Sequence, residues 1–207
     1  MTEKIFPPST SFVSTALIDE EKYKKMYSES VSDPTGFWDK HGQRVEWVKP
    51  YTKIKNVSFE SSKVDIKWYE DGSLNVCYNC IDRHLEKYAN KTAIIWEPDD
   101  PNDHSIKITY EQLSREVNKF SNVLKTMGAK KGDRVVIYMP MIPEATYAML
   151  ACARIGAIHS VVFAGFSSDA LASRIKGCDA SILITADEAP RGGKNTPLKK
   201  SADAALD

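Results

Sequence analysis

A regular alternation of short apolar runs and amphipathic stretches in the second part of the sequence constrains the fold more than any other feature. The apolar runs 134–139, 158–163 and 181–185 are separated by segments whose apolar residues recur at helical spacing. Continuous apolar runs of this length are typical of strands buried on both faces of a parallel sheet. Because strand–helix–strand units connect by right-handed crossovers, the pattern predicts an α/β fold with a mostly parallel sheet flanked by helices.

The helices between these runs have clear start and stop signals. Thr109 and Gln112 form a capping box at the start of an apolar stripe, and Gly128 ends that stripe. Pro143 stands at the first position of the next helix, which Gly156 ends. These signals fix the approximate bounds of two helices.

The segment before residue 70 is rich in Lys, Ser and aromatic residues and shows no alternation of strands and helices. Asp19 is placed to cap a helix over 20–30, and Asp33 with Pro34 supplies a cap and a first-turn proline for another helix. We interpret this region as a helical wrap that precedes the sheet.

The change between the two parts gives the predicted domain limits, an N-terminal extension over 1–90 and a truncated α/β domain over 91–207. The second part opens with β-rich runs at 92–96 and 106–109, which predict a hairpin. The chain stops at Asp207, inside the start of a further helix, and ending in the middle of a crossover leaves a strand edge unpaired. We therefore expect the sequence to be a piece of a longer protein.

Charge and hydropathy exclude several classes of protein. The 28 basic and 28 acidic residues cancel and are interspersed, whereas a general nucleic-acid-binding protein carries a clustered excess of Lys and Arg. No apolar stretch is long enough to span a bilayer, and residues 1–8 lack the apolar core of a signal peptide. We expect a cytoplasmic protein with neither a nucleic-acid nor a membrane partner.

Two of the four cysteines, Cys77 and Cys80, form a C-x-x-C pair, which could belong to a redox site or to half of a zinc site. No second pair follows at a zinc spacing, and Cys77, Ile81, Leu85 and Tyr88 repeat at helical spacing. We therefore interpret both cysteines as core residues of one amphipathic helix.

Two cations flank two glycines in the loop after the last apolar run: Arg191, Gly192, Gly193 and Lys194. Ligands of α/β sheets bind beyond the carboxyl ends of the strands. Backbone N–H groups and a guanidinium could approach one anion there, and a phosphate would fit. The alternative is an exposed loop whose cations are solvated.

The apolar run before that one ends in a turn formed by Phe163, Ala164 and Gly165. Small residues before a helix start let a ligand touch backbone, and Phe163 or Phe166 could offer a stacking face. The alternative is an ordinary turn with core phenylalanines. His159, inside the same run, is interpreted as a buried histidine with satisfied hydrogen bonds.

The motifs of several enzyme classes are absent. The sequence has no Walker-type glycine loop, no G-x-S-x-G elbow, no H-E-x-x-H metal motif and no paired carboxylates in a shared apolar setting. We therefore assign no catalytic residue and no metal ligand.

Longer motifs, taken together and in order, resemble the AMP-forming acetyl-CoA synthetases, and the match covers nearly all 207 residues. They are the runs 132–144 and 148–163, the segments 184–188 and 191–194, Asp33-Pro34 with Phe37-Trp38, and Trp68-Tyr69 with Asp71-Gly72. The resemblance implies the adenylate-forming ligase fold, with a large N-terminal and a small mobile C-terminal domain. It also implies a reaction in which acetate and ATP with Mg²⁺ give acetyl-adenylate, from which the CoA thiol displaces AMP.

The resemblance places part of the CoA site in this chain. The loop 191–194 matches the one that holds the phosphorylated adenosine end of CoA, and Phe163 with Ala164 and Gly165 matches the turn beside the adenine. Ala164 departs from the Gly that is more frequent in the family, and Lys194 stands where Arg is also common. The family's ATP, Mg²⁺ and acetate sites lie in sequence beyond this chain, so we expect the chain alone to be inactive.

Two alternatives stay open. A propionyl-CoA synthetase would have the same motifs, because the acyl pocket that separates acetate from propionate lies beyond Asp207. A protein of another class, a freestanding CoA-binding module without a catalytic domain, would also account for the residues present.

Overall fold

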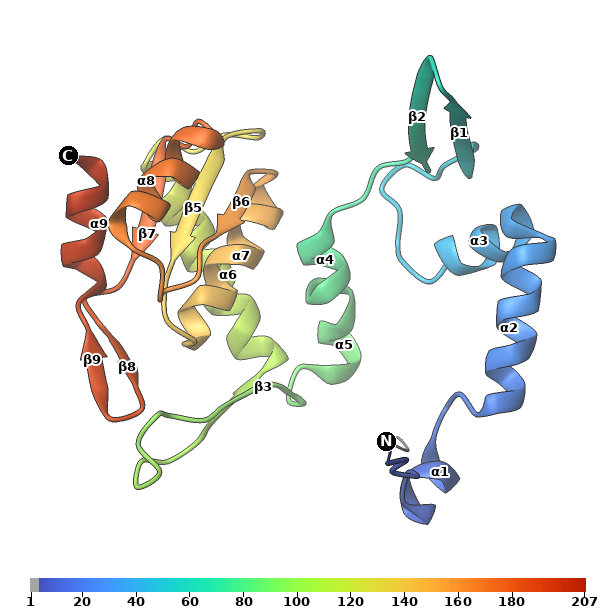
Figure 1. Cartoon of the computed structure of the whole chain (residues 1–207), viewed down its shortest axis with the longest axis horizontal. Coiled ribbons are helices and arrows are strands. Elements are labelled where there is room, and N and C mark those ends of the chain that lie inside the picture. The colour runs from blue at the N-terminus through green and yellow to red at the C-terminus, as the bar shows by residue number, and fades with distance from the viewer. Residues whose placement is uncertain (1–3) are drawn as a thin grey trace. The chain divides into compact units, whose positions relative to one another are not determined.

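The computed structural model describes residues 4–207, which fall into two compact units, one ending at Ser73 and one over Leu74–Asp207 (Figure 1). The elements of the first unit are helices α1 (Thr10–Thr15), α2 (Glu20–Ser32) and α3 (Pro34–Gly42) and strands β1 (Lys55–Glu60) and β2 (Lys63–Trp68), which pair antiparallel. The predicted caps are confirmed, because the side chains of Asp19 and Asp33 accept the N–H groups of Lys22 and Gly36.

Aromatic contacts hold much of the first unit together. Among its described residues no apolar side chain is buried. The Tyr51 ring contacts those of Trp47 and Tyr69, at 4.9 and 4.6 Å between centroids, and these two rings contact each other at 5.5 Å. Trp38 meets Trp68 edge to face at 5.8 Å.

The second unit contains a longer series of elements. They are α4 (Val76–Cys80), a 3₁₀ turn (Asp82–His84), α5 (Leu85–Tyr88), β3 (Thr92–Trp96), β4 (Ile106–Thr109), α6 (Tyr110–Thr126), β5 (Arg134–Tyr138), α7 (Pro143–Ile155), β6 (Ile158–Val161), α8 (Ser168–Gly177), β7 (Ile182–Thr185), β8 (Ala189–Arg191), β9 (Lys194–Thr196) and α9 (Leu198–Leu206). Strands β3 and β4 form the predicted hairpin.

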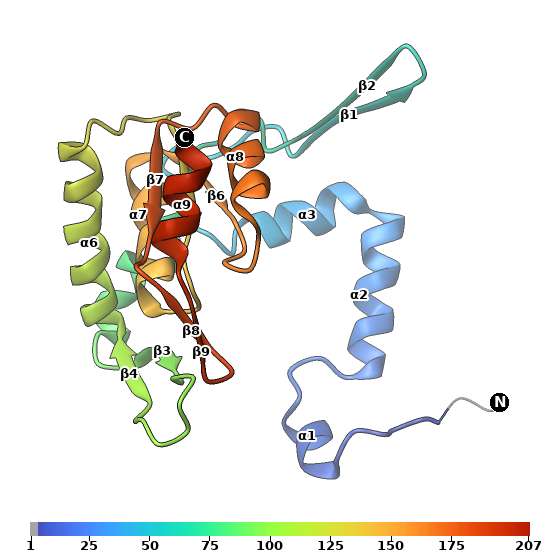
Figure 2. The same cartoon turned by 60° about the vertical axis from the view of Figure 1, so that its left-hand side comes forward.

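A three-stranded parallel sheet in the order β6–β5–β7 is the centre of this unit. Alternate residues of β5 point to opposite faces. Val135 and Ile137 belong to a core cluster with residues of α6 and α7, whereas Val136 and Tyr138 pack with Leu171 of α8 and with residues of α9. Figure 2 shows α6 on one side of the sheet and α8 on the other. The predicted α/β class is thereby confirmed.

The predicted helix signals are confirmed in detail. The Thr109 hydroxyl accepts the N–H of Gln112, whose side-chain oxygen accepts the N–H of Thr109 at 2.8 Å. Gly156 ends α7 in the left-handed conformation, at φ 77°. These signals were sufficient to predict the helix ends, because each acts between residues within one turn of helix.

The prediction for His159 is wrong, because its side chain is exposed. Strand β6 is shorter than the apolar run and ends at Val161. It pairs with β5 along one side, and within residues 4–207 no other strand pairs along its outer side. Ile158 and Val161 of the same strand are also exposed.

The single helix predicted around the C-x-x-C pair is broken. At Ile81 the backbone turns to φ −125° and ψ −67°, which separates α4 from the 3₁₀ turn. Cys77 is buried in the core, as predicted, and burial raises the pKa of its thiol to about 11. Cys80 is exposed, so its assignment to the core is wrong.

Helix α4 and the turn after it pack within the second unit. Asn75 donates its side-chain N–H to the carbonyl oxygens of Ala153 and Arg154, and Arg154 pairs with Asp82 at 3.0 Å. The predicted domain limits, 1–90 and 91–207, stay a prediction, because packing of this kind does not define a domain.

Candidate functional site

The structure brings together the two segments that the sequence analysis treated as separate candidates. The guanidinium carbon of Arg191, at the end of β8, lies 5.4 Å from the centroid of the Phe163 ring, in the turn after β6. A cation at this distance over an aromatic face is attracted by the ring quadrupole. The two segments therefore form one surface site within the second unit.

Strand β5 holds the turn that carries Phe163. The hydroxyl of Tyr138, at the end of β5, donates to the carbonyl oxygens of Phe166 and Ala164, at 2.9 and 3.2 Å. Tyr138 is itself fully buried, so the centre of the sheet fixes the turn. Helix α8 begins next, with the Ser167 hydroxyl accepting the N–H of Ala170.

Gly165 lets the Phe163 ring lie against this turn. A Cβ atom on Gly165 would stand 2.5 Å from a ring carbon of Phe163, which is far inside van der Waals contact. Any larger residue would displace the ring. This is a steric reason for glycine at a position where the backbone itself is not left-handed.

The two phenylalanines of the turn are surface residues. Phe163 is 52% exposed and meets Phe166 edge to face at 5.8 Å. The Arg174 guanidinium lies 4.3 Å from the Phe166 ring centroid. The alternative of core phenylalanines is therefore wrong, and each ring has a cation beside it.

The four residues from Arg191 to Lys194 form a hairpin rather than an irregular loop. Strands β8 and β9 pair antiparallel, with Arg191 opposite Lys194. Gly192 and Gly193 make the connection at φ 61° and 73°, and two consecutive positive φ values are what a two-residue type I′ hairpin requires. Residues directly opposite each other lie on the same face, so both cations serve one side of the hairpin.

Asp99, which the sequence analysis did not single out, binds the tip of this hairpin. The N–H groups of Gly192 and Gly193 donate to its two carboxylate oxygens, at 2.8 and 3.0 Å. Both views place the loop between β3 and β4, which carries Asp99, beside the hairpin tip (Figure 1, Figure 2). These bonds, and then the nearby Arg191 charge, hold the pKa of Asp99 below its ordinary value.

The two glycine N–H groups thus donate to a carboxylate of the protein itself. The contact joins residues 93 positions apart in the sequence. The only sequence signal near Asp99 was a Pro, Asp and Asn cluster that predicts a turn, and a turn signal carries no information about a distant partner.

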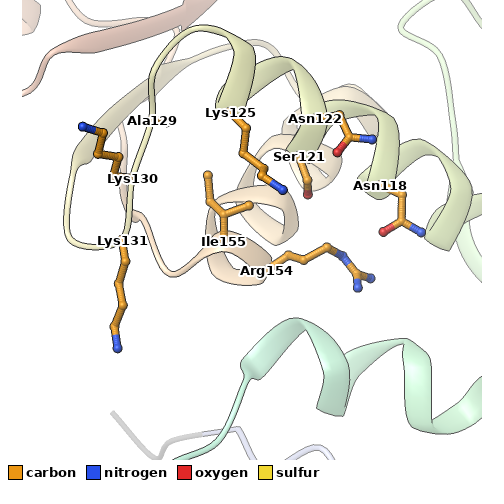
Figure 3. Close-up of a pocket in the computed structure, with 9 residues that line it drawn as sticks. All are labelled: Asn118, Ser121, Asn122, Lys125, Ala129, Lys130, Lys131, Arg154 and Ile155. Carbon is orange, nitrogen blue, oxygen red and sulfur yellow. The ribbon is translucent and has the colours of Figure 1, made fainter.

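A separate cavity of about 560 Å³ lies between the ends of α6 and α7 and contains none of the predicted site residues (Figure 3). In Figure 3, Asn118, Asn122 and Lys125 come from α6 and Arg154 comes from α7. Cations at the carboxyl ends of helices complement the helix dipoles, and carbonyl groups there disfavour an anionic ligand. Arg154 is also engaged by Asp82. We therefore place the candidate site at Arg191 and Phe163.

Metal ligands are not grouped in the described part of the chain. Across residues 4–207, no three His, Cys, Asp or Glu side chains come together in an arrangement that could hold a metal ion. Among the same residues, no helix has the length and apolar character needed to cross a membrane.

Comparison with solved structures supports the fold. Acetoacetyl-CoA synthetase from Streptomyces lividans superimposes with a TM-score of 0.79 over 93% of this chain and 29% of its own length. Because the two sequences are only 21% identical, this likeness shows the fold alone.

Comparison with sequence families and curated proteins shows the family. Residues 81–206 match the model of the AMP-binding enzymes, and residues 23–80 match that of the acetyl-coenzyme A synthetase N-terminus. The acetyl-coenzyme A synthetases of Methylocella silvestris and Bradyrhizobium diazoefficiens are 59% and 60% identical over all of this chain, which spans about a third of their length. The chain therefore belongs to the family of AMP-binding enzymes, and it resembles the acetyl-coenzyme A synthetases along its whole length.

Proposed function

We propose that this chain forms part of the CoA site of an AMP-forming acetate–CoA ligase, which makes acetyl-CoA from acetate, ATP and CoA through an acetyl-adenylate. The single observation that carries the proposal is the Arg191 guanidinium over the exposed Phe163 ring. The preference for acetate rests on the names of the curated relatives.

The surface suits the phosphorylated adenosine end of CoA. Phe163 offers an aromatic edge and face for the adenine, beside the backbone of Ala164 and Gly165. Arg191 and Lys194 flank the hairpin tip and supply two positive charges for the 3′-phosphate. A guanidinium can bind phosphate with two parallel hydrogen bonds, whereas the Lys194 ammonium acts as a point charge.

The glycines of the hairpin have a geometric role in this proposal. Gly192 and Gly193 close the two-residue turn that holds both cations on one side. Their N–H groups bind Asp99, so the phosphate contacts fall to the side chains of Arg191 and Lys194.

We infer that the chain alone does not catalyse adenylation. That step needs positioned charge around the ATP triphosphate and its Mg²⁺, which supplies charge stabilisation when bound. The resemblance to the acetyl-coenzyme A synthetases places the residues for this step beyond residue 207, so we assign the ion no ligand in this chain.

Calorimetric titration of the 207-residue protein with CoA tests the proposal. We expect saturable binding of CoA, no binding of acetate, and no acetate-dependent exchange of pyrophosphate into ATP. The same titration with Arg191→Ala serves as the site control. Absence of CoA binding would overturn the assigned site, and exchange above a protein-free blank would overturn the proposed inactivity.

A further inference from the structure

We propose that Asp99 is a positioning residue for the CoA site: its carboxylate ties down the tip of the β8–β9 hairpin and so holds Arg191 and Lys194 where a phosphate can meet both. This inference rests on the proposed function. It adds a residue from the β3–β4 loop that does not itself touch the ligand.

The contact is a two-point attachment. Each oxygen of the Asp99 carboxylate accepts one backbone N–H, from Gly192 at 2.8 Å and from Gly193 at 3.0 Å. Hydrogen bonds to an ionised carboxylate are stronger than those between neutral groups. Two bonds to consecutive N–H groups fix the orientation of the tip as well as its position.

The hairpin depends on outside support because it is small. Its strands have three residues each, and all of them except Ala189 are exposed. Pro190, in the middle of β8, has no N–H to donate. A two-stranded hairpin is marginally stable on its own, and two glycines at the turn add backbone freedom.

Removing Asp99 should change CoA affinity in opposite directions, depending on whether its carboxylate holds the hairpin or occupies the place of the phosphate. If Asp99 merely occupied a phosphate site, its removal would free the two glycine N–H groups and take away a negative charge, so CoA would bind more tightly. If Asp99 holds the hairpin, its removal lets the Arg191 guanidinium leave the Phe163 ring, and CoA binds more weakly. The sign of the change in affinity separates the two roles.

Amide exchange at Gly192 and Gly193 tests the tether without any ligand. In isotope-labelled protein followed by NMR, we expect Asp99→Ala to speed exchange at these two amides by at least about tenfold, because both lose their acceptor. Asp100→Ala is the matched control. It removes the same charge from the same loop, but the Asp100 carboxylate accepts from Asn102 and not from the hairpin.

Calorimetric CoA titrations of the same variants test the consequence. We expect Asp99→Ala to weaken CoA binding about three- to tenfold and Asp100→Ala to change it less than about twofold. Once Arg191 is already Ala, Asp99→Ala should weaken binding clearly less, because only Lys194 is then left to be positioned. If Asp99 only stabilised the fold, the effects of Asp99→Ala and Arg191→Ala on the free energy of CoA binding would add. A combined effect smaller than this sum shows that Asp99 acts through Arg191.

The outcomes that overturn the inference are distinct from failure of the proposed function. Unchanged glycine exchange in Asp99→Ala would show that the tether does not exist. Faster exchange with equal or tighter CoA binding would show that the tether does not serve the site. If the wild-type protein does not bind CoA, the proposed function fails, and the glycine exchange still decides whether Asp99 holds the hairpin.

Discussion

The guanidinium of Arg191 lies over the ring of Phe163, with 5.4 Å between the guanidinium carbon and the ring centroid. Arg191 is the last residue of β8 in the hairpin, and Phe163 lies in the turn after β6 of the parallel sheet. Their contact places a cation and an aromatic face within reach of one ligand. In the proposed function this arrangement is present before a ligand binds.

Substituting Gly165 by Ala tests the steric part of this arrangement. The new Cβ would stand 2.5 Å from a Phe163 ring carbon, so the ring must leave its place beside Arg191. We expect CoA affinity to fall about three- to tenfold, because the aromatic contact is lost while the backbone is kept. Calorimetric titration with CoA provides the measurement.

Gly177→Ala is the matched control for this substitution. A Cβ atom at Gly177 has no neighbour within 4 Å, and the residue lies at the end of α8. We expect this variant to bind CoA as the wild type does. Equal affinities of Gly165→Ala and Gly177→Ala would show that the position of the Phe163 ring does not matter for binding.

Thiol labelling at pH 8 tests the break in the helix around the C-x-x-C pair. Burial raises the pKa values of Cys77 and Cys152 to about 11, so little reactive thiolate is present, whereas Cys80 is exposed. With an aromatic disulfide reagent, and with the partly exposed Cys178 replaced by Ser, we expect one fast equivalent from Cys80. The buried thiols should react at least about a hundredfold more slowly until the protein unfolds.

Cys80→Ser identifies the reacting residue. This substitution should abolish the fast phase and leave the slow phases unchanged. In the Cys178→Ser background, a fast phase that survives Cys80→Ser, or a second fast equivalent when Cys80 is present, would contradict the burial of Cys77 and Cys152.

Acid titration tests the contacts of the Asp71 carboxylate in the first unit. The hydroxyl of Thr52, followed by the N–H of Lys53, lowers the pKa of Asp71 from 3.8 to about 2. Because the pKa is lowered on folding, this contact stabilises the folded state above about pH 4 and loses its effect as the pH falls toward 2. We expect the Thr52 and Lys53 amide resonances to titrate with a midpoint near pH 2.

The control for this titration is Thr52→Val, which removes the hydroxyl donor and keeps the shape of the side chain. It should move the midpoint upward, toward the ordinary value for aspartate. A wild-type midpoint near pH 4 would mean that the Asp71 carboxylate is not held by these donors in solution.

Elements set by local chemistry could be predicted from the sequence. The capping box at Thr109, the proline start at Pro143 and the glycine stop at Gly156 were all correct. The parallel pairing of β5 with β6 and β7 followed from apolar runs that alternate with helices. Each of these signals is contained in a few neighbouring residues, so no distant partner was needed to interpret it.

Features set by distant contacts could not be predicted in the same way. The bond between Asp99 and the hairpin joins segments 93 residues apart, and the sequence pattern around Asp99 indicates only a turn. His159 was wrongly assigned to the interior because an apolar run does not reveal whether a strand lies at the edge of its sheet. The break at Ile81 was missed because it interrupts a helical repeat whose apolar positions continue beyond it.

The most direct test of the proposed site compares CoA with dephospho-CoA in wild-type protein and in Arg191→Ala. If Arg191 binds the 3′-phosphate, the wild type should lose about ten- to a hundredfold in affinity when that phosphate is removed, on the order of 1.5 to 3 kcal/mol for a charge-assisted contact. Arg174→Ala, which removes the cation beside Phe166, should show the wild-type difference between the two ligands. In Arg191→Ala we expect a much smaller difference between the two ligands, whereas equal losses in wild type and Arg191→Ala would show that Arg191 does not bind the 3′-phosphate.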